Sequence, residues 1–280
     1  MSQARTIQIF LPDGNARSIR IADITSRTVQ AIQIPRNKLK DGNMRAEIKN
    51  VGVYFLFGEE SEEAKPSAYI GEAENCYDRL NQHNKDTKKD FWRTAVVFTS
   101  KTSSFTKAHG KYLEWFCVNA AREVDRYKID QITPSKPFVS ESMEADLLDN
   151  LDAIRILLST LGFPILETIQ KPKSDKDVLH CKRKEYYAEG EYIDDGFVVF
   201  KGSKAKTTES AAANSWIRNL RKRLIDSGVL KMEGNFLVFQ SDYVFDSPSA
   251  AAGAIFGIHA NGWTEWKNKD GKTLDELKRK

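Results

Sequence analysis

The chain has 280 residues, of which 40% are hydrophobic and 29% charged, and its formal net charge is +4 at pH 7. This composition excludes fibrous and largely disordered proteins, and the length allows two domains that each bury a core. Since no uninterrupted apolar run approaches the roughly 18 residues that a membrane-spanning helix needs, we expect no membrane partner.

The cysteines Cys76, Cys117 and Cys181 are widely spaced and include no Cys-x-x-Cys pair. Neither a disulfide framework nor a zinc site is therefore expected. The first residues lack the apolar block of a signal peptide, and we expect a cytoplasmic protein. The mildly basic charge is compatible with a polyanionic partner, although a solvated surface of mixed sign explains it equally well.

Residues 1–48 are interpreted as an N-terminal β extension. Alternating runs at 6–11 and 18–21 flank a Pro-Asp-Gly turn, which predicts a hairpin, and a mixed segment at 24–34 follows. Nothing in this extension indicates catalysis. We expect it to pack on the next domain, and a role in recognising substrate is the alternative.

The stretch at 51–57 is apolar, aromatic and β-branched, which predicts a buried strand. A polar loop leads to a second short strand at 68–71, so the two form a hairpin. Side chains alternate along a strand, so Tyr54 faces away from its immediate neighbours. The hairpin brings Tyr54 and Tyr69 onto neighbouring strands.

A helix is predicted next, at 72–84. Asn75, Arg79 and His83 are four residues apart and are expected to share one face of it. The lysine-rich loop beyond this helix supplies candidate phosphate contacts, for which a solvated loop is an equally good interpretation. These candidates are Lys85, Lys88, Lys89 and Arg93.

A third strand at 92–99 and a long helix at 105–124 complete the predicted domain. On one face of that helix, Lys107, Lys111 and Glu114 follow one another at spacings of four and three. A carboxylate flanked by two lysines could therefore face the same cleft as the arginine and histidine of the preceding helix.

Beyond this region we expect an amphipathic helix at 141–161 and a polar linker at 170–177. Residues 178–280 then form a separate α+β domain with a strand at 196–200 and a helix at 209–226. That helix carries a basic cluster interpreted as a second nucleic-acid contact, with a solvated face as the alternative. The cluster consists of Arg218, Arg221 and Lys222.

Together, Gly52-Val53-Tyr54, Tyr69-Ile70-Gly71, the Arg79/His83 pair and Glu114 in Tyr112-Leu113-Glu114 resemble the catalytic half of a GIY-YIG nuclease. The resemblance implies an α+β fold with a small three-stranded sheet flanked by helices, within a domain at 49–169. The C-terminal part resembles an uncharacterised domain that commonly trails GIY-YIG modules. This order of domains is similar to that of bacterial members.

The resemblance also implies a metal-dependent endonuclease that acts on DNA, with Mg²⁺ as cofactor and Mn²⁺ as an alternative. The implied catalytic residues are Tyr54, Tyr69, Arg79, His83 and Glu114. Glu114 would be the metal ligand, because magnesium prefers hard oxygen donors. Arg79 would hold a phosphate oxygen, and either Tyr54 or His83 would be the general base.

One position departs from the family pattern. Where the family usually places an asparagine beyond the glutamate, this chain has Gln131, which keeps the amide but lengthens the side chain by one methylene. We count it as a supporting residue, together with Lys107 and Lys111. The departure motivates an alternative, in which the chain is an inactive nucleic-acid-binding protein that retains the nuclease fold. A second alternative is a nuclease recruited by a C-terminal protein-interaction module.

Overall fold

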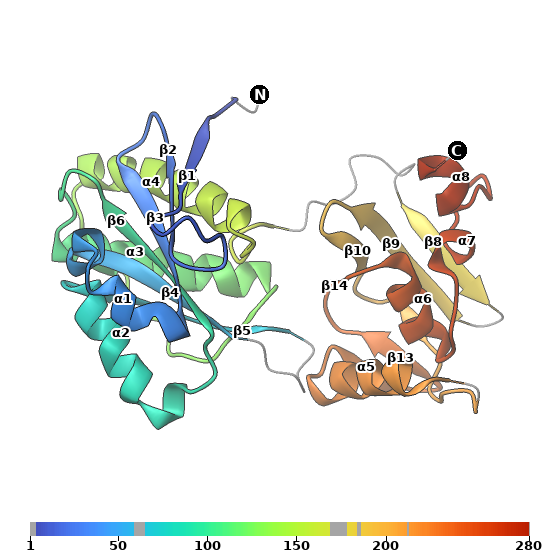
Figure 1. Ribbon diagram of the computed structural model, residues 1–280. Coiled ribbons are helices and arrows are strands. Elements are labelled where there is room, and N and C mark those ends of the chain that lie inside the picture. Colours follow the sequence, from blue (N-terminus) through green and yellow to red (C-terminus); the bar gives the residue numbers. More distant parts are fainter. Residues whose placement is uncertain (1–3, 59–64, 169–177, 184–185, 212, 280) are drawn as a thin grey trace. The chain divides into compact units, whose positions relative to one another are not determined.

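The computed structural model describes residues 4–58, 65–168, 178–183, 186–211 and 213–279. These residues form two compact units (Figure 1), one up to residue 168 and the other from residue 178 onwards. Both units combine helices with β-sheet, so the predicted α+β class is confirmed. The predicted linker at 170–177 lies outside the described residues.

The first unit is built on one seven-stranded sheet with the order β1-β2-β3-β6-β4-β5-β7. All neighbouring strands are antiparallel except β5 and β7. The strands are β1 (Ile7–Phe10), β2 (Arg20–Ile24), β3 (Val29–Pro35), β4 (Gly52–Gly58), β5 (Ser67–Ala73), β6 (Thr94–Ser100) and β7 (Lys128–Ile129). The expected three-stranded core, β4, β5 and β6, is therefore present within a larger sheet.

The N-terminal extension is part of this sheet. Strand β3 pairs with β6 along its whole length, from Val29 opposite Ser100 to Pro35 opposite Thr94. All residues of β3 but Pro35 are buried, because layers of helices cover both faces of the sheet at this point. The extension thus packs on the neighbouring strands through backbone hydrogen bonds.

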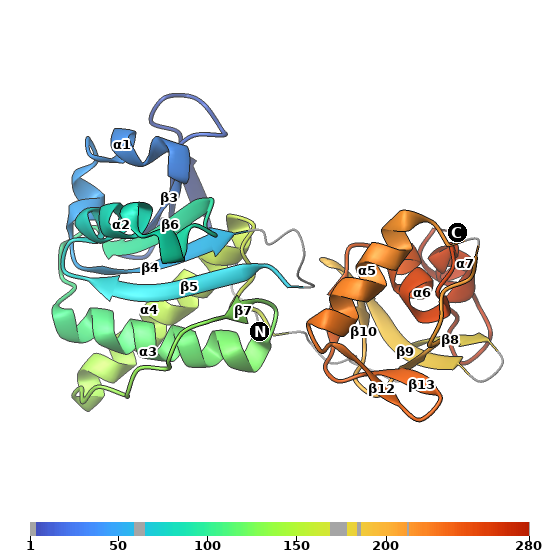
Figure 2. The same ribbon diagram turned by 90° about the horizontal axis from the view of Figure 1, so that it is seen from below.

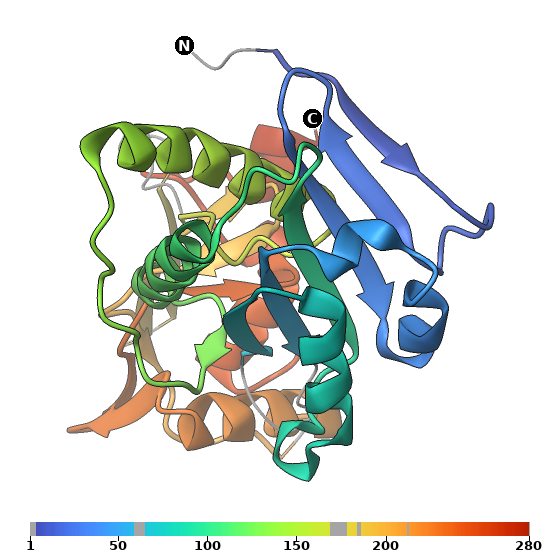
Figure 3. The ribbon, with the colours of Figure 1, turned by 90° about the vertical axis from the view of Figure 1, so that its left-hand side faces the viewer.

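Helices cover both faces of the sheet. Figures 2 and 3 show α1 and α2 on one face and α3 and α4 on the other. The helices are α1 (Leu39–Gly42), α2 (Cys76–Lys85), α3 (Lys107–Val124) and α4 (Glu141–Thr160), and the 3-10 turns are η1 (Arg36–Lys38), η2 (Ala46–Lys49) and η3 (Thr87–Lys89). Along β4, Val53 and Phe55 join the core beneath α3 and α4, while Tyr54 and Leu56 join the one beneath α2. The predicted alternation of side chains is confirmed.

The second helix starts later than its sequence pattern suggests. Strand β5 continues to Ala73, and α2 begins only at Cys76. The side chain of Asn75 accepts a hydrogen bond from the backbone N–H of Asp78 at 3.2 Å, so it caps the helix. Asparagine is among the residues that best satisfy the free N–H groups of a first turn. The prediction that Asn75 shares a helical face with the arginine and histidine is therefore wrong.

In its described residues, the second unit has a separate core between two sheets and four helices. One sheet has the order β14-β10-β9-β8 and the other β11-β13-β12. Its strands are β8 (Leu179–Arg183), β9 (Tyr186–Ile193), β10 (Gly196–Val199), β11 (Lys204–Ala205), β12 (Leu230–Glu233), β13 (Phe236–Phe239) and β14 (Tyr243–Phe245). Its helices are α5 (Ser215–Asp226), α6 (Pro248–Phe256), α7 (Gly262–Glu265) and α8 (Leu274–Lys278). Within the described parts of both units, no helix has the length and apolar character that crossing a membrane requires.

Candidate active site

The side chain of Tyr54 on β4 lies over a glycine of the neighbouring strand β5. Its side chain is only 1% exposed, and its partner in register on β5 is Gly71. A β-carbon added to Gly71 would lie 2.3 Å from Tyr54 Oη and 2.5 Å from Cζ. The phenol therefore occupies the space of the missing side chain, and only glycine at position 71 permits this.

The hydroxyl of Tyr54 meets two side chains from α2. Tyr54 Oη lies 2.8 Å from His83 Nε2, and Arg79 Nε donates to the same oxygen at 3.4 Å. Arg79 and His83 are one helical turn apart, so both face the phenol. Gln82 orients the guanidinium, since its Oε1 accepts a hydrogen bond from Arg79 Nη1 at 2.8 Å.

Burial controls the protonation of this pair. It raises the pKa of Tyr54 far above its ordinary value, so the phenol stays protonated at neutral pH. Burial, assisted by the charges of Arg79 and Lys89, lowers the pKa of His83 to about 4. The imidazole is therefore neutral at pH 7, and in the tautomer that carries its proton on Nδ1 it accepts a hydrogen bond from the phenol.

Tyr69 and Lys89 form the next part of the site. The rings of Tyr69 and Tyr54 are 6.3 Å apart and inclined by 29°, and Lys89 Nζ lies 2.9 Å from the centre of the Tyr69 ring. An ammonium group over an aromatic face is stabilised by the ring's quadrupole. Burial and the nearby Arg79 lower the pKa of Lys89 to about 8. Lys89, predicted as a contact in the loop, thus lies beside the phenols.

Glu114 acts on this group from α3. Burial and the charge of Glu72 raise the pKa of Glu114 to about 6, while Arg79 and Lys111 oppose this shift. Burial is the main cause that raises the pKa of both phenols, and the charge of Glu114 adds to this effect. Although α3 and α2 cover opposite faces of the sheet, the carboxylate is within electrostatic reach of the arginine and both tyrosines.

The outer edge of β5 is only partly covered by another strand. Strand β7 pairs with β5 only at Ser67 and Ala68. Gln131 continues this pairing through its side chain: Oε1 accepts from the N–H of Ile70 at 2.8 Å, and Nε2 donates to the C=O of Ile70 at 2.7 Å. Among the described residues no strand pairs with the outer edge of β5 beyond Ala68.

Family models match a part of each unit. One described as the GIY-YIG catalytic domain matches residues 50–128. This chain carries a GIY-YIG domain. A second model, a domain of unknown function named DUF4357, matches residues 179–278, so the predicted order of domains is confirmed. No curated protein and no solved structure matches the chain.

The GIY-YIG match spans the strands and helices from β4 to α3. The five side chains named above as the implied catalytic residues all lie within it, whereas Gln131 and the three N-terminal strands lie outside. A GIY-YIG domain supports a nuclease-type function in general.

The acidic side chains of the GIY-YIG domain fit a hard metal ion. Among the described residues there is no group of three or more His, Cys, Asp or Glu that could hold a metal. Magnesium, however, commonly takes one or two carboxylates and completes its shell with water and substrate phosphate. Glu114 and Glu72, which influence each other electrostatically, offer this donor set. Glu72 was missed from the sequence, although it directly follows the Tyr-Ile-Gly stretch and by alternation faces α3.

The remaining basic residues of the first unit differ in their surroundings. Lys107 forms an ion pair with Glu74 at 2.9 Å, and both side chains are exposed. Lys111 lowers the pKa of Glu114 by its charge. The other predicted contacts of the loop, Lys85, Lys88 and Arg93, are exposed.

The prediction that Arg221 contacts nucleic acid is wrong. Its side chain is 0% exposed, and its Nε donates to Glu209 Oε1 at 2.7 Å. The other guanidinium nitrogens donate to the backbone carbonyls of Ala254 and Lys206. Arg221 lies on the buried face of α5, with apolar residues one, three and four positions away. The helical periodicity of the sequence therefore predicts that Arg221 is buried. The remaining members of the cluster, Arg218 and Lys222, are exposed.

Proposed function

We propose that the chain is a metal-dependent endonuclease that hydrolyses phosphodiester bonds of DNA at its GIY-YIG site. The observation that carries this proposal is the contact between Tyr54 Oη and His83 Nε2 at 2.8 Å, with Arg79 donating to the same oxygen. A phenol, an imidazole and a guanidinium thus converge within reach of the charge of Glu114.

Hydrolysis requires a base that activates water. His83 is neutral at pH 7 and its Nε2 faces the phenol, so we assign it as the final proton acceptor. Tyr54 gives its proton to His83 as it takes one from the attacking water. A phosphate bound beside Arg79 raises the pKa of His83 towards neutrality, because the negative charge stabilises the imidazolium.

The other side chains bind and orient the substrate. Arg79 is permanently charged and holds a nonbridging phosphate oxygen. Tyr69, beneath Lys89, orients the water, and the ammonium of Lys89 adds positive charge at the phosphate. A Mg²⁺ or Mn²⁺ ion held by Glu114 and Glu72 would supply Lewis-acid stabilisation of the developing charge.

The domain division is part of the proposal. Residues 49–169 form the catalytic domain with its trailing helix, 170–177 the linker, and 178–280 an accessory domain. We also propose a cytoplasmic location, since Cys76, Cys117 and Cys181 are all free and buried, as expected of thiols in a reducing compartment.

A plasmid-nicking assay in Mg²⁺ and Mn²⁺ tests this function. Glu114→Gln should lower the nicking rate by at least about 100-fold, because it replaces a carboxylate that would hold the metal ion, and with it the stabilisation of charge on the reacting phosphate. Glu123→Gln neutralises an exposed carboxylate on the same helix and should leave the rate unchanged. An RNA oligonucleotide of matched sequence distinguishes the two nucleic acids.

Two results would overturn the proposal in different ways. If the wild-type protein binds DNA but shows no metal-dependent nicking, the chain is a binding protein that retains the nuclease fold. If Glu114→Gln nicks DNA at the wild-type rate while remaining folded by circular dichroism, the assigned site is not the reacting one.

A further inference from the structure

The first unit contains an open cavity of about 850 Å³ that the proposed chemistry does not use. Its lining comprises three asparagines, Leu39 and four cationic side chains, with no carboxylate. The cations are Arg36 and Lys40, from the N-terminal extension, and Lys85 and Arg93, from the GIY-YIG domain. Neither part of the chain forms this cavity alone.

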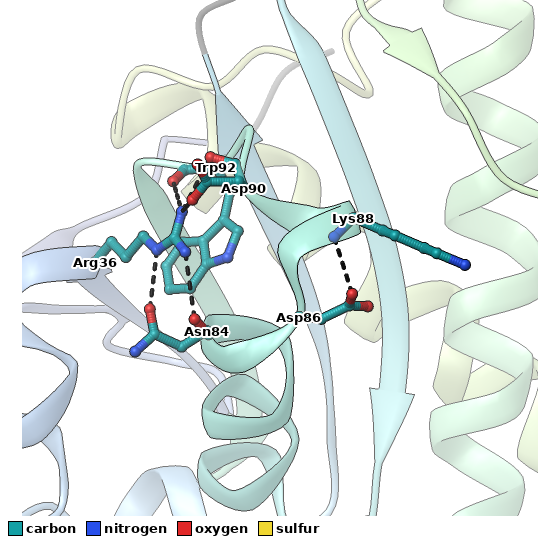
Figure 4. A network of polar contacts seen from close by, with 6 residues as sticks. All are labelled: Arg36, Asn84, Asp86, Lys88, Asp90 and Trp92. Carbon is teal, nitrogen blue, oxygen red and sulfur yellow. Dashed lines mark hydrogen bonds and ion pairs between the residues drawn. The ribbon is translucent and has the colours of Figure 1, made fainter.

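Arg36 fixes the wall of the cavity. Its guanidinium donates to Asn84 Oδ1 at 2.9 Å and pairs with Asp90 at 2.8 Å, and it lies 5.0 Å from the centre of the Trp92 ring (Figure 4). Its backbone N–H donates to the carbonyl of Arg93 at 2.8 Å. Because these contacts join η1 to the end of α2 and the start of β6, the cavity is a built feature of the fold.

The other three cations are not neutralised. Lys40, Lys85 and Arg93 are exposed, and in the part of the chain that the structure describes no carboxylate forms an ion pair with them. The amide oxygen of Asn84 is occupied by Arg36, so its NH₂ group, which points away from the guanidinium in Figure 4, remains as a donor. Cations and N–H donors without a carboxylate are the chemistry that recognises an anion.

We propose that this cavity binds backbone phosphates of the nucleic-acid strand that flanks the cleaved bond. The inference rests on the proposed function, since it names how the substrate of the GIY-YIG site is held. Helix α2 connects the two sites: Arg79 and His83 face the phenols, while Asn84 and Lys85, next along the chain, line the cavity. A nucleic-acid strand bound at the phenols would therefore reach the cavity by passing the C-terminal end of α2.

Fluorescence anisotropy with a short mixed-sequence DNA duplex tests the proposal. All variants are made in the full-length Glu114→Gln protein, so that cleavage does not interfere. Lys40→Gln and Arg93→Gln should each weaken binding about three- to tenfold, and each should reduce the slope of log K against log salt by about 0.9 for every phosphate that is no longer neutralised. Lys101→Gln is the control. Lys101 follows the last residue of β6, whereas Arg93 precedes its first, and Lys101 forms an ion pair with Asp23.

The outcomes separate the two proposals. Weaker binding and a smaller salt slope in Lys40→Gln and Arg93→Gln, but not in the control, support the phosphate site whether or not the wild-type protein cleaves. If all three variants bind like the parent while wild type nicks DNA, the cavity proposal is refuted and the nuclease stands. If the two cavity substitutions weaken binding of a polyglutamate probe but not of DNA, the cavity takes an acidic peptide and the proposal is also overturned.

Discussion

Replacing Gly71 by alanine should displace the phenol on which the proposed chemistry depends. The new β-carbon would lie 2.3 Å from Tyr54 Oη, whereas ordinary van der Waals contact begins near 3.4 Å. The phenol must therefore move by about 1 Å, as overpacked side chains do. Such a shift would lengthen or break the 2.8 Å contact with His83 Nε2.

The burial of Tyr54 sets the expected loss of stability in Gly71→Ala. Because the Tyr54 side chain is 1% exposed, the clash is not relieved by movement into solvent, and overpacking typically costs about 1–3 kcal/mol. Alanine in a strand regains about 0.5–1 kcal/mol relative to glycine through the unfolded chain. We therefore expect Gly71→Ala to lower the free energy of unfolding by about 1–2 kcal/mol.

A double-mutant cycle identifies the cause. Tyr54→Leu removes all three atoms that the new β-carbon would touch, Oη, Cζ and Cε1, so Gly71→Ala should be neutral or stabilising in that background, with a coupling of about 1–3 kcal/mol. Tyr54→Phe retains Cζ, which would lie 2.5 Å from the β-carbon, so most of the penalty should remain.

Urea unfolding of the single and double variants gives these energies, and plasmid nicking gives the functional effect. A misplacement of about 1 Å at a catalytic group costs on the order of 100-fold in rate, so Gly71→Ala should nick far more slowly than wild type. An equal destabilisation by Gly71→Ala in the wild-type and Tyr54→Leu backgrounds would show that the phenol does not occupy this space.

Three further predictions concern stability. Burial lowers the pKa of His83 from 6.5 to about 4, so between these pH values the unfolded chain binds a proton that the folded chain does not. The free energy of unfolding should therefore be unaffected by the titration of His83 above about pH 6.5 and should fall by up to about 3 kcal/mol as the pH is lowered to 4. Urea unfolding at pH 7 and pH 5 should show a decline that His83→Leu lacks, and parallel declines would contradict this. Gln131→Ala removes the side chain that bonds both the N–H and the C=O of Ile70, and should lower the free energy of unfolding by about 1–2 kcal/mol. Hydrogen exchange of the Ile70 amide, followed by NMR, should become faster. An unchanged exchange rate would show that Gln131 does not bond Ile70. Arg221→Ala should cost about 2–4 kcal/mol in thermal unfolding, because the carbonyls of Ala254 and Lys206 lose their donors and a fully buried side chain is removed. The neighbouring Lys222→Ala should stay within about 0.5 kcal/mol, and similar values for both would contradict the burial of Arg221.

The parts of the GIY-YIG domain that depend on short-range pattern were accessible from the sequence. The apolar run around Tyr54 has the composition of a buried strand, and the spacing of Arg79 and His83 fixes their common direction on a helix. Their placement in one site with Tyr54 was implied by the resemblance to the GIY-YIG family, and the structure shows both side chains at the Tyr54 hydroxyl. For these residues local preference and tertiary packing agree.

Other features depend on contacts that a linear pattern does not contain. The bridge from Gln131 to the backbone of Ile70 joins residues 61 positions apart, and no propensity encodes such a pairing. The spacing of Asn75 from Arg79 fits a shared helical face, but asparagine is also a strong N-cap residue, and in the structure it caps α2. Charge alone suggested that Arg221 faces solvent, whereas its position on the apolar stripe of α5 decides its burial.

The pairing of β3 with β6 has a consequence for any shortened protein. The boundaries of the GIY-YIG match, 50–128, cut through a continuous hydrogen-bonded ladder. A fragment made to those limits would present the backbone of β6, flanked by buried valines and phenylalanine, as a bare template for strand addition. Such a fragment is expected to self-associate, and a fragment that keeps β6 paired with β3 has to include the chain from Val29 onwards.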